Sequence, residues 1–328
     1  MKAILVKQPG GPEQLILGEY EQPLPGPYEL LVKVHATALN RADTLQRQGK
    51  YPPPKGASPI LGLEIAGVVE EAGINCTKYK KGDKVFGLLP GGGYAEYALI
   101  HEEMAMPIPD NLSFEEAAAI PEVFLTAWQA LVWLGKLQAG ERVLIHAGAS
   151  GVGTAAIQLA RTLKAEVLVT ASEGKLHACK ELGAHKLINY QDPDVPFEDE
   201  VLAYTNNEGV DVIIDFIAGP YFNQNLDCLR LDGRLVILAS LGGGKVDNVD
   251  LRKILTKRLQ VIGSTLRSRT KEYQIKLTED LSRFALPLFK EGKLKPVVDS
   301  VYDWEDVAEA HHYIESNKNI GKIVLRVS

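Results

Sequence analysis

The chain has 328 residues, of which 45% are hydrophobic and 24% charged, and its formal net charge is −6. A chain of this length and apolar content can form one large domain or two of ordinary size. Its negative charge disfavours nucleic acid and anionic lipid as partners. No apolar run reaches the length of a membrane span, no signal-peptide pattern begins the chain, and three scattered cysteines argue against disulfides or a structural zinc lobe, so we expect a cytoplasmic protein.

The first third of the chain is predicted to be mostly antiparallel β structure. β-Branched and apolar runs at 29–35 and 64–70 are typical of strands, and proline- and glycine-rich turns separate them. One short helix is expected at 41–47. Further along, the capping-box spacing that begins at Ser113 predicts a helix start, and Pro121 opens a second helix over 122–134.

From residue 142 to 265, short buried strands alternate with helices. The predicted strands are 142–146, 166–170, 187–189, 211–215, 234–239 and 260–265, and the helices are 152–162, 174–182, 197–204, 221–229 and 250–256. This alternation predicts an α/β domain with a parallel, doubly wound sheet. After residue 271 the pattern returns to helix, a strand at 296–301, a helix at 304–317 and a strand at 322–327. We therefore predict a discontinuous β-rich domain (1–121 and 266–328) with a dinucleotide-binding domain (122–265) inserted into it.

The glycine-rich stretch HAGASGVG (146–153) links the first of these strands to the first helix. In a Gly-x-Gly-x-x-Gly diphosphate loop, Gly148 and Gly153 would take the first and third places, while Ser150 takes the second and Gly151 follows it. A serine still offers its backbone N–H, and the helix N-terminus still attracts phosphate. Because the motif opens a six-strand alternating segment, we prefer a diphosphate site to a simple tight turn.

The end of the second strand indicates which dinucleotide is bound. An acidic residue there would bind a ribose 2′-hydroxyl, whereas a basic residue would bind a 2′-phosphate. The strand ends at the small Ala171, and Ser172 and Lys175 follow. Glu173 also lies close enough to bind the ribose, so NAD stays possible. Lys175 favours NADP, although a solvent-exposed helix residue is its ordinary role.

Several ordered segments resemble one protein family. They are Asn40-Arg-Ala-Asp43, Gln46-Arg-Gln-Gly49, Ala119-Ile-Pro-Glu122, Leu125-Thr-Ala127, the 146–159 loop and helix, and Asn317-Lys-Asn-Ile-Gly-Lys-Ile-Val324. The chain resembles the zinc-free quinone oxidoreductase (zeta-crystallin-like) branch of the medium-chain dehydrogenase/reductase superfamily. Within that branch it resembles the tumour-suppressor-inducible group most. The resemblance implies a Rossmann domain with a six-stranded parallel sheet and a mostly antiparallel, GroES-like catalytic domain.

The resemblance also shows which metal ligands are missing. Zinc-dependent members carry a cysteine where this chain has Asn40, and a histidine where it has Leu63 before Glu64. Zinc needs three or four such ligands in fixed geometry, so we expect no metal. Without this Lewis acid, alcohol oxidation is disfavoured and an already electrophilic acceptor, such as a quinone, is favoured.

Positions of the family's functional residues carry over one by one. Asn40 is expected at the nicotinamide side of the cleft and Tyr51 in the substrate pocket, both as catalytic residues. The alternatives are that Asn40 caps the helix it begins, a role compatible with the first, and that Tyr51 only packs before the proline run. The cofactor-binding residues that the resemblance implies are Asn40 and Thr126 for the nicotinamide end; Gly148, Ser150, Gly151, Val152 and Gly153 for the diphosphate; Ser172, Lys175 and Tyr190 for the 2′-phosphate; and Leu241, Gly242, Leu266 and Asn319 flanking or closing the nicotinamide site. The loop from Ala171 to Lys175 is one residue shorter than in the resembled group. This difference weakens the assignment of Ser172 to the 2′-phosphate and predicts a smaller preference for NADP over NAD.

The leading hypothesis is an NADPH-dependent quinone reductase, with ortho-quinones as plausible acceptors. The alternatives are an NADPH-dependent reductase of α,β-unsaturated ketones or aldehydes, and a weakly catalytic NADPH-binding protein. The family commonly forms homodimers through the last Rossmann strand, and the apolar segment Leu259-Gln-Val-Ile-Gly263 suits that role. We expect small-molecule partners and a second copy of the chain, with no nucleic acid and no membrane.

Overall fold

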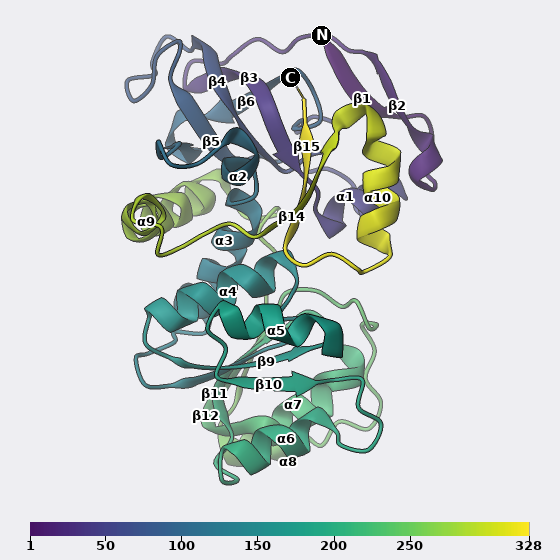
Figure 1. Ribbon diagram of the computed structural model, residues 1–328, viewed down its shortest axis with the longest axis vertical. Coiled ribbons are helices and arrows are strands. Elements are labelled where there is room, and N and C mark those ends of the chain that lie inside the picture. Colours follow the sequence, from purple (N-terminus) through teal and green to yellow (C-terminus); the bar gives the residue numbers. More distant parts are fainter. Residues whose placement is uncertain (328) are drawn as a thin grey trace. The chain divides into compact units, whose positions relative to one another are not determined.

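The computed structural model describes residues 1–327, and the chain divides into two compact units. One unit contains Met1–Leu125 and the segment from Arg267 onward, and the other contains Thr126–Leu266. The first boundary falls inside helix α3 (Pro121–Trp128), whereas the sequence placed it after residue 121. Figure 1 labels the elements of both units.

The discontinuous unit is built on a seven-stranded sheet with the order β14-β15-β3-β4-β5-β7, and β6 also pairs with β3. All these pairs are antiparallel except β14 with β15. The strands are β3 (Glu29–Ala38), β4 (Glu64–Ala72), β5 (Lys84–Leu88), β6 (Tyr97–His101), β7 (Ala105–Pro107), β14 (Val298–Asp303) and β15 (Lys322–Arg326), with a separate hairpin of β1 (Lys2–Val6) and β2 (Leu15–Glu19). The predicted antiparallel β domain is confirmed.

The helices of this unit follow the capping signals in the sequence. They are α1 (Arg41–Arg47), α2 (Phe114–Ala118), α9 (Lys271–Lys290) and α10 (Val307–Glu315). Ser113 caps α2, because its hydroxyl accepts a hydrogen bond from the N–H of Glu116 at 3.2 Å and the Glu116 carboxylate accepts one from the N–H of Ser113 at 2.8 Å. This is the capping box expected from the spacing.

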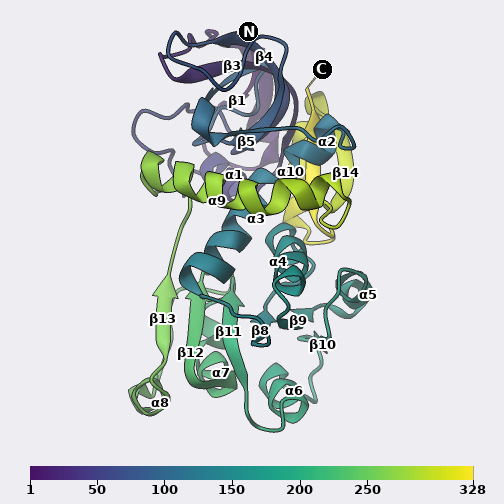
Figure 2. The same ribbon diagram turned by 90° about the vertical axis from the view of Figure 1, so that its left-hand side faces the viewer.

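The inserted unit is a six-stranded parallel sheet with the order β10-β9-β8-β11-β12-β13, visible strand by strand in Figure 2. Its strands are β8 (Arg142–Ile145), β9 (Glu166–Ala171), β10 (Lys186–Asn189), β11 (Val210–Asp215), β12 (Leu229–Ile237) and β13 (Gln260–Gly263), and its helices are α4 (Gly151–Thr162), α5 (Glu173–Glu181), α6 (Phe197–Tyr204), α7 (Phe222–Cys228) and α8 (Leu251–Lys257). This is the Rossmann strand order, and the predicted fold class is confirmed.

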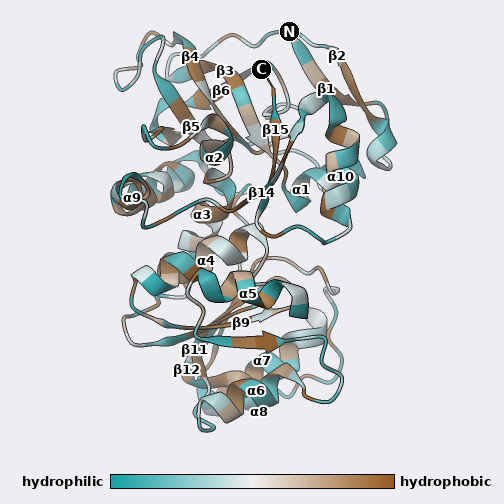
Figure 3. Ribbon diagram, viewed as in Figure 1, coloured by the Kyte–Doolittle hydropathy of each residue, from teal (hydrophilic) through white to brown (hydrophobic). Residues whose placement is uncertain are grey.

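Burial explains why the sequences of these strands are continuous apolar runs. Both faces of a parallel sheet are covered by helices, so every residue of β11 is buried. Leu144, Ile213 and Leu235 from three neighbouring strands pack in one cluster with Phe197 and Leu226 from the helices. Figure 3 shows the apolar residues of β10, whereas α5 alternates hydrophilic and apolar residues. Strand β12 begins five positions earlier than predicted because Leu229 already pairs with Val210 before a register shift.

The segment Phe114–Leu134 is long and apolar enough to span a membrane by length and composition alone. It joins α2, α3 and a π-helical stretch (Gln129–Leu134), a longer apolar run than the sequence indicated. However, 78% of its most apolar window is buried by the rest of the protein. Its apolar character is therefore explained by packing in the protein interior.

Candidate active site

In the discontinuous unit, Asn40 lies at the centre of a buried polar cluster. Its Nδ2 donates hydrogen bonds to Glu64 Oε1 at 2.8 Å and to the carbonyl of Ala38 at 3.3 Å. The Lys322 ammonium donates to Asn40 Oδ1 at 2.6 Å and lies 2.8 Å from Glu64 Oε1. Lys322 is 4% exposed and Glu64 is fully buried. Both amide hydrogens of Asn40 are thus used within the protein, and its oxygen accepts from Lys322.

Three chain segments position this cluster. Asn40 follows β3, Glu64 begins β4 and Lys322 begins β15, and β3 pairs with both of the other strands. The second carboxylate oxygen of Glu64 accepts a hydrogen bond from the N–H of Glu122 at 2.8 Å. The Lys322 ammonium also donates to the carbonyl of Leu39 at 2.6 Å. Asn40 is therefore held in place by its neighbours rather than free to rotate.

Asp43 holds the backbone beside Asn40. Its carboxylate accepts hydrogen bonds from the N–H of Asn40 at 2.8 Å and from the N–H of Gly62 at 3.0 Å. Burial raises the pKa of Asp43 to about 6, although these two hydrogen bonds oppose the rise. Gly62 has φ +98°, and a Cβ there would lie 2.7 Å from the Cα of Gly93, so only glycine fits.

This cluster does not fit a zinc ion. Zinc requires several Cys, His or carboxylate ligands around one point, and residues 1–327 contain no group of three such side chains that could hold a metal. The Lys322 ammonium instead lies within 2.8 Å of both Asn40 and Glu64. A fixed positive charge at this point opposes a second cation.

Tyr51 lies against a buried arginine. The guanidinium carbon of Arg267 is 5.4 Å from the centre of the Tyr51 ring. Arg267 is 8% exposed and donates to the carbonyl of Pro90 and to Gln46 Oε1, each at 2.7 Å through Nη2. Its Nη1 is buried and makes no hydrogen bond with any residue that the structure describes. Burial raises the pKa of the Tyr51 hydroxyl, Arg267 lowers it and Glu122 raises it.

Glu122 adds a titratable group to this region. Burial first, and then the negative charge of Glu64, raise the pKa of the Glu122 carboxyl to about 7, while Lys322 lowers it. A group with this pKa exchanges protons near neutral pH. Lys322, Arg267 and the side chain of Glu122 were not identified from the sequence as site residues. The only available signal for Glu122 and Lys322 was their place inside the Ala119–Glu122 and Asn317–Val324 segments, and for Arg267 it was the place next to Leu266.

In the inserted unit, the glycine-rich loop has the shape that a diphosphate needs. A Cβ on Gly153 would lie 2.5 Å from the carbonyl oxygen of Gly148 and even closer to that of Ala147. A Cβ on Gly148 would lie 2.9 Å from Val169. Ser150 is the N-cap of α4, and its hydroxyl accepts from the N–H of Gly153 at 3.1 Å. The two glycines therefore allow close packing, and Ser150 begins the helix.

Gly151 and Val152 form the first turn of α4, which has 12 residues. The N–H groups of this turn and the positive end of the helix dipole suit a negatively charged phosphate. The loop thus fits the dinucleotide that the sequence predicted. When bound, a nicotinamide dinucleotide supplies the hydride for a reduction.

A buried hydrogen-bond network lies beneath this loop. His146 Nε2 is 2.7 Å from Asn225 Oδ1, and His146 Nδ1 is 3.0 Å from Thr170 Oγ1. Asn225 Nδ2 donates to Asp215 at 3.0 Å, and Asp215 also accepts from the N–H groups of Ile217 and Ala218. Because the amide oxygen of Asn225 must accept, His146 carries its proton on Nε2. Burial lowers the pKa of His146, which keeps the ring neutral. This histidine packs within the protein, as expected from its place at a strand end.

The three residues predicted at the 2′-phosphate come from adjacent elements. Ser172 is the N-cap of α5, and Lys175 lies in the first turn of that helix. Tyr190 follows β10, and its N–H donates to the carbonyl of Ala171 at the end of β9. Tyr190 is 46% exposed, and Glu173 is exposed beside Ser172. One sheet edge thus carries a basic, an aromatic and a hydroxyl side chain, together with one acid.

The remaining predicted cofactor residues lie in separate places. Leu241 and Gly242 form a turn after β12, where the N–H of Gly242 donates to the carbonyl of Ile217. Thr126 lies in α3 and Leu266 follows β13, both less than 10% exposed. Asn319 belongs to the discontinuous unit, and its amide donates to the carbonyl of Gly321 at 2.8 Å.

Comparisons with known proteins agree with these features. Residues 26–110 match the family model of the alcohol dehydrogenase GroES-like domain, and residues 151–283 match that of the zinc-binding dehydrogenase. Human quinone oxidoreductase is 36% identical over 337 residues, covering 99% of this chain and 97% of the relative.

Solved structures of the same fold superpose closely on the whole chain. An NAD-dependent alcohol dehydrogenase has a TM-score of 0.89 at 35% identity, with both chains covered completely. The CurK enoyl reductase has a TM-score of 0.87 at 30% identity, covering 100% of this chain and 99% of that one. A mycobacterial protein, Rv1454c, complexed with NADPH has a TM-score of 0.88 at 28% identity, again with both chains covered completely.

Proposed function

Because the chain belongs to the quinone oxidoreductase branch of the medium-chain dehydrogenase/reductase superfamily, we propose that it is a zinc-independent, NADPH-dependent quinone reductase. We include ortho-quinones among its acceptors. The observation that carries the proposal is the cluster of Asn40, Glu64 and Lys322, where an amide and an ammonium stand in place of metal ligands.

The chemistry follows from what this cluster lacks and what it holds. Because the residues of this cluster do not fit a metal ion, the site offers no Lewis acid to polarise an alcohol. The acceptor must then be electrophilic by itself, and a quinone is, because its reduced form is an aromatic hydroquinone. The reduced oxygen still needs a proton. We assign its donation to the Tyr51 hydroxyl, whose raised pKa keeps it protonated at neutral pH.

The preference for NADPH rests on Lys175 and Tyr190 at the edge formed by β9 and β10. A lysine ammonium binds a 2′-phosphate by a charge-assisted hydrogen bond. Glu173 beside it weakens the preference, because its carboxylate repels phosphate. We therefore expect discrimination between the two nucleotides that is real but moderate.

Separate titrations with NADPH and NADH, followed by steady-state turnover on ortho- and para-quinones, test the proposal. We expect NADPH to bind about tenfold more tightly than NADH, which corresponds to ~1.4 kcal/mol, and to be oxidised fastest with ortho-quinones.

Tyr51→Phe should lower kcat by about tenfold or more, whereas Tyr28→Phe, at a site 52% exposed, should not change it. No nucleotide oxidation above background with any quinone would contradict the proposal.

A reductase of α,β-unsaturated ketones or aldehydes is the second candidate. It is favoured by the likeness to the CurK enoyl reductase at 30% identity. The same assay with an enone panel separates the two: turnover of enones without turnover of quinones supports the second candidate. Tight NADPH binding with neither activity indicates the weakly catalytic binding protein instead.

We further propose a homodimer that works in the cytoplasm. Strand β13 lies at one edge of the parallel sheet, and Val261 on it is 40% exposed. An exposed apolar edge strand is suited to pairing with a second copy. The net charge of −6 disfavours nucleic acid and anionic membranes as further partners.

A further inference from the structure

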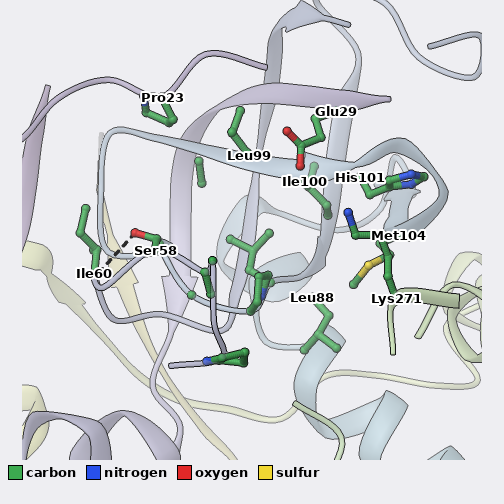
Figure 4. Close-up of a pocket in the computed structure, with 18 of the residues that line it drawn as sticks. Pro23, Glu29, Ser58, Ile60, Leu88, Leu99, Ile100, His101, Met104 and Lys271 are labelled. Atoms are coloured by element: carbon green, nitrogen blue, oxygen red, sulfur yellow. Dashed lines mark hydrogen bonds between the residues drawn. The ribbon is translucent and has the colours of Figure 1, made fainter. Parts of the chain in front are cut away.

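A cavity of about 450 Å³ lies within the discontinuous unit, and of the candidate-site residues described above it is lined by Arg267 and Pro90. Its volume is within the range of small-molecule sites, about 300–1,000 Å³. Figure 4 shows Leu99, Ile100 and Glu29 along one part of it, with Ser58 and Ile60 on one side and His101, Met104 and Lys271 on the other. Asn40, Tyr51 and Glu64 do not line it. The cavity therefore shares Arg267 with the proposed reductase site but contains none of the three residues Asn40, Tyr51 and Glu64.

The body of the cavity is apolar. Its walls include Ile60, Leu88, Ile100 and Met104, each less than 5% exposed, and the half-buried Leu99. These side chains come from the 54–60 loop, β5, β6 and the 3₁₀ turn Glu102–Met104. Walls of this kind bind a hydrocarbon or aromatic body by removing it from water.

The charged groups of the cavity are predominantly basic. Four cationic side chains line it, Lys55, Arg267, Arg269 and Lys271, against the two carboxylates of Glu21 and Glu29. Glu29 is already engaged, because one of its carboxylate oxygens accepts from the N–H of Gly26 at 3.0 Å.

Several of these cations have unused binding capacity. Within residues 1–327, neither Lys55 nor Lys271 makes an ion pair, and Lys271 lies beside Met104 at the cavity (Figure 4). The buried Arg267, another wall residue, has its Nη1 without a hydrogen-bond partner among the described residues.

We propose that this cavity binds a small amphipathic carboxylate, with its apolar body against Leu99 and Met104 and its anionic head near Lys271. The cations exceed the carboxylates in number, which favours an anion over a neutral or cationic ligand. The two glutamates would repel a second negative charge, which favours a monovalent carboxylate over a phosphate dianion. Binding here does not depend on the proposed reductase activity.

Calorimetric titration of the full chain with three probes of equal length tests the proposal: octanoate, 1-octanol and octylammonium. We expect one octanoate per chain, bound at least tenfold more tightly than the other two. Lys271→Gln should weaken octanoate by about tenfold without affecting octanol. The matched control, Lys290→Gln at the other end of α9, should leave octanoate binding unchanged, because Lys290 is exposed and does not line the cavity.

Leu99→Trp provides a second test, because it fills the apolar body and should remove binding of all three probes. Its circular dichroism spectrum and NADPH binding show whether the fold is kept. Equal affinity for the three probes, tighter binding of octylammonium, or no binding of octanoate would each overturn the proposal. Octanoate binding that neither Lys271→Gln nor Leu99→Trp weakens would place the site elsewhere and overturn it as well.

Discussion

Lys322 illustrates how a single buried charge can depend on its partners. Its ammonium contacts Glu64, Asn40 and the carbonyl of Leu39 at 2.6–2.8 Å. We predict that Lys322→Met lowers the free energy of unfolding by about 3–5 kcal/mol, because it leaves the Glu64 carboxylate buried without a cation. Urea unfolding followed by circular dichroism measures this loss.

Two further variants separate the charge effect from other causes. Adding Glu64→Gln to Lys322→Met removes the uncompensated carboxylate, so the double variant should be more stable than the single one. Lys318→Met changes an exposed lysine nearby and should stay within about 0.5 kcal/mol of the wild type. Equal losses in the single and double variants would show that packing, rather than charge, explains the effect.

Lys175 is the residue to which we assign the proposed preference for NADPH. Replacing it by alanine removes the charged partner proposed for the 2′-phosphate, a contact of about 1.5–3 kcal/mol. Lys175→Ala should therefore raise the NADPH dissociation constant by about tenfold or more and change that of NADH little. Fluorescence titration measures both. Lys180→Ala, an exposed lysine on the same helix, is the matched control, and an equal change for NADPH and NADH would reject the assignment.

At the scale of elements, the loop between β8 and α4 shows what one glycine does. A Cβ on Gly153 would collide with the carbonyl oxygens of Ala147 and Gly148. We predict that Gly153→Ala displaces the start of α4, lowers thermal stability and weakens NADPH at least tenfold. Gly174→Ala in α5 is the control, because a Cβ there meets nothing within 4 Å. It should be neutral or slightly stabilising. Similar losses in both variants would contradict the steric explanation.

The elements were predictable from the sequence where local pattern decides them. The alternating apolar runs of β8 to β13 and the capping box at Ser113 led to element positions within a few residues of the structure, except that β12 begins five positions earlier than predicted. The cluster around Asn40 was not predictable in this way. Glu64 and Lys322 are 258 positions apart, and they meet only because β3 pairs with both β4 and β15. A lysine near a chain end has no local feature that marks it as buried.

The same limit applied to the candidate site. Gly148, Gly153 and Ser150 could be assigned because a diphosphate loop has a compact spacing that sterics dictate. Arg267 could not be assigned by its side chain, because its contacts with Pro90 and Gln46 join segments far apart in the chain. For the same reason, nothing in the sequence indicated the cavity beside Leu99 and Lys271.

At the scale of the whole molecule, the proposed homodimer predicts which edge strand pairs with a second copy. Each of two edge strands carries one partly exposed valine that can be compared with the other. Val261 on β13 and Val301 on β14 are each 40% exposed. If the homodimer forms through β13, Val261→Glu places two like charges opposite each other across the two-fold axis and should shift the protein to monomers. Val301→Glu adds the same charge to the edge of the other sheet and should leave the dimer intact. Sedimentation velocity distinguishes the outcomes, and dissociation by Val301→Glu alone would move the interface to β14.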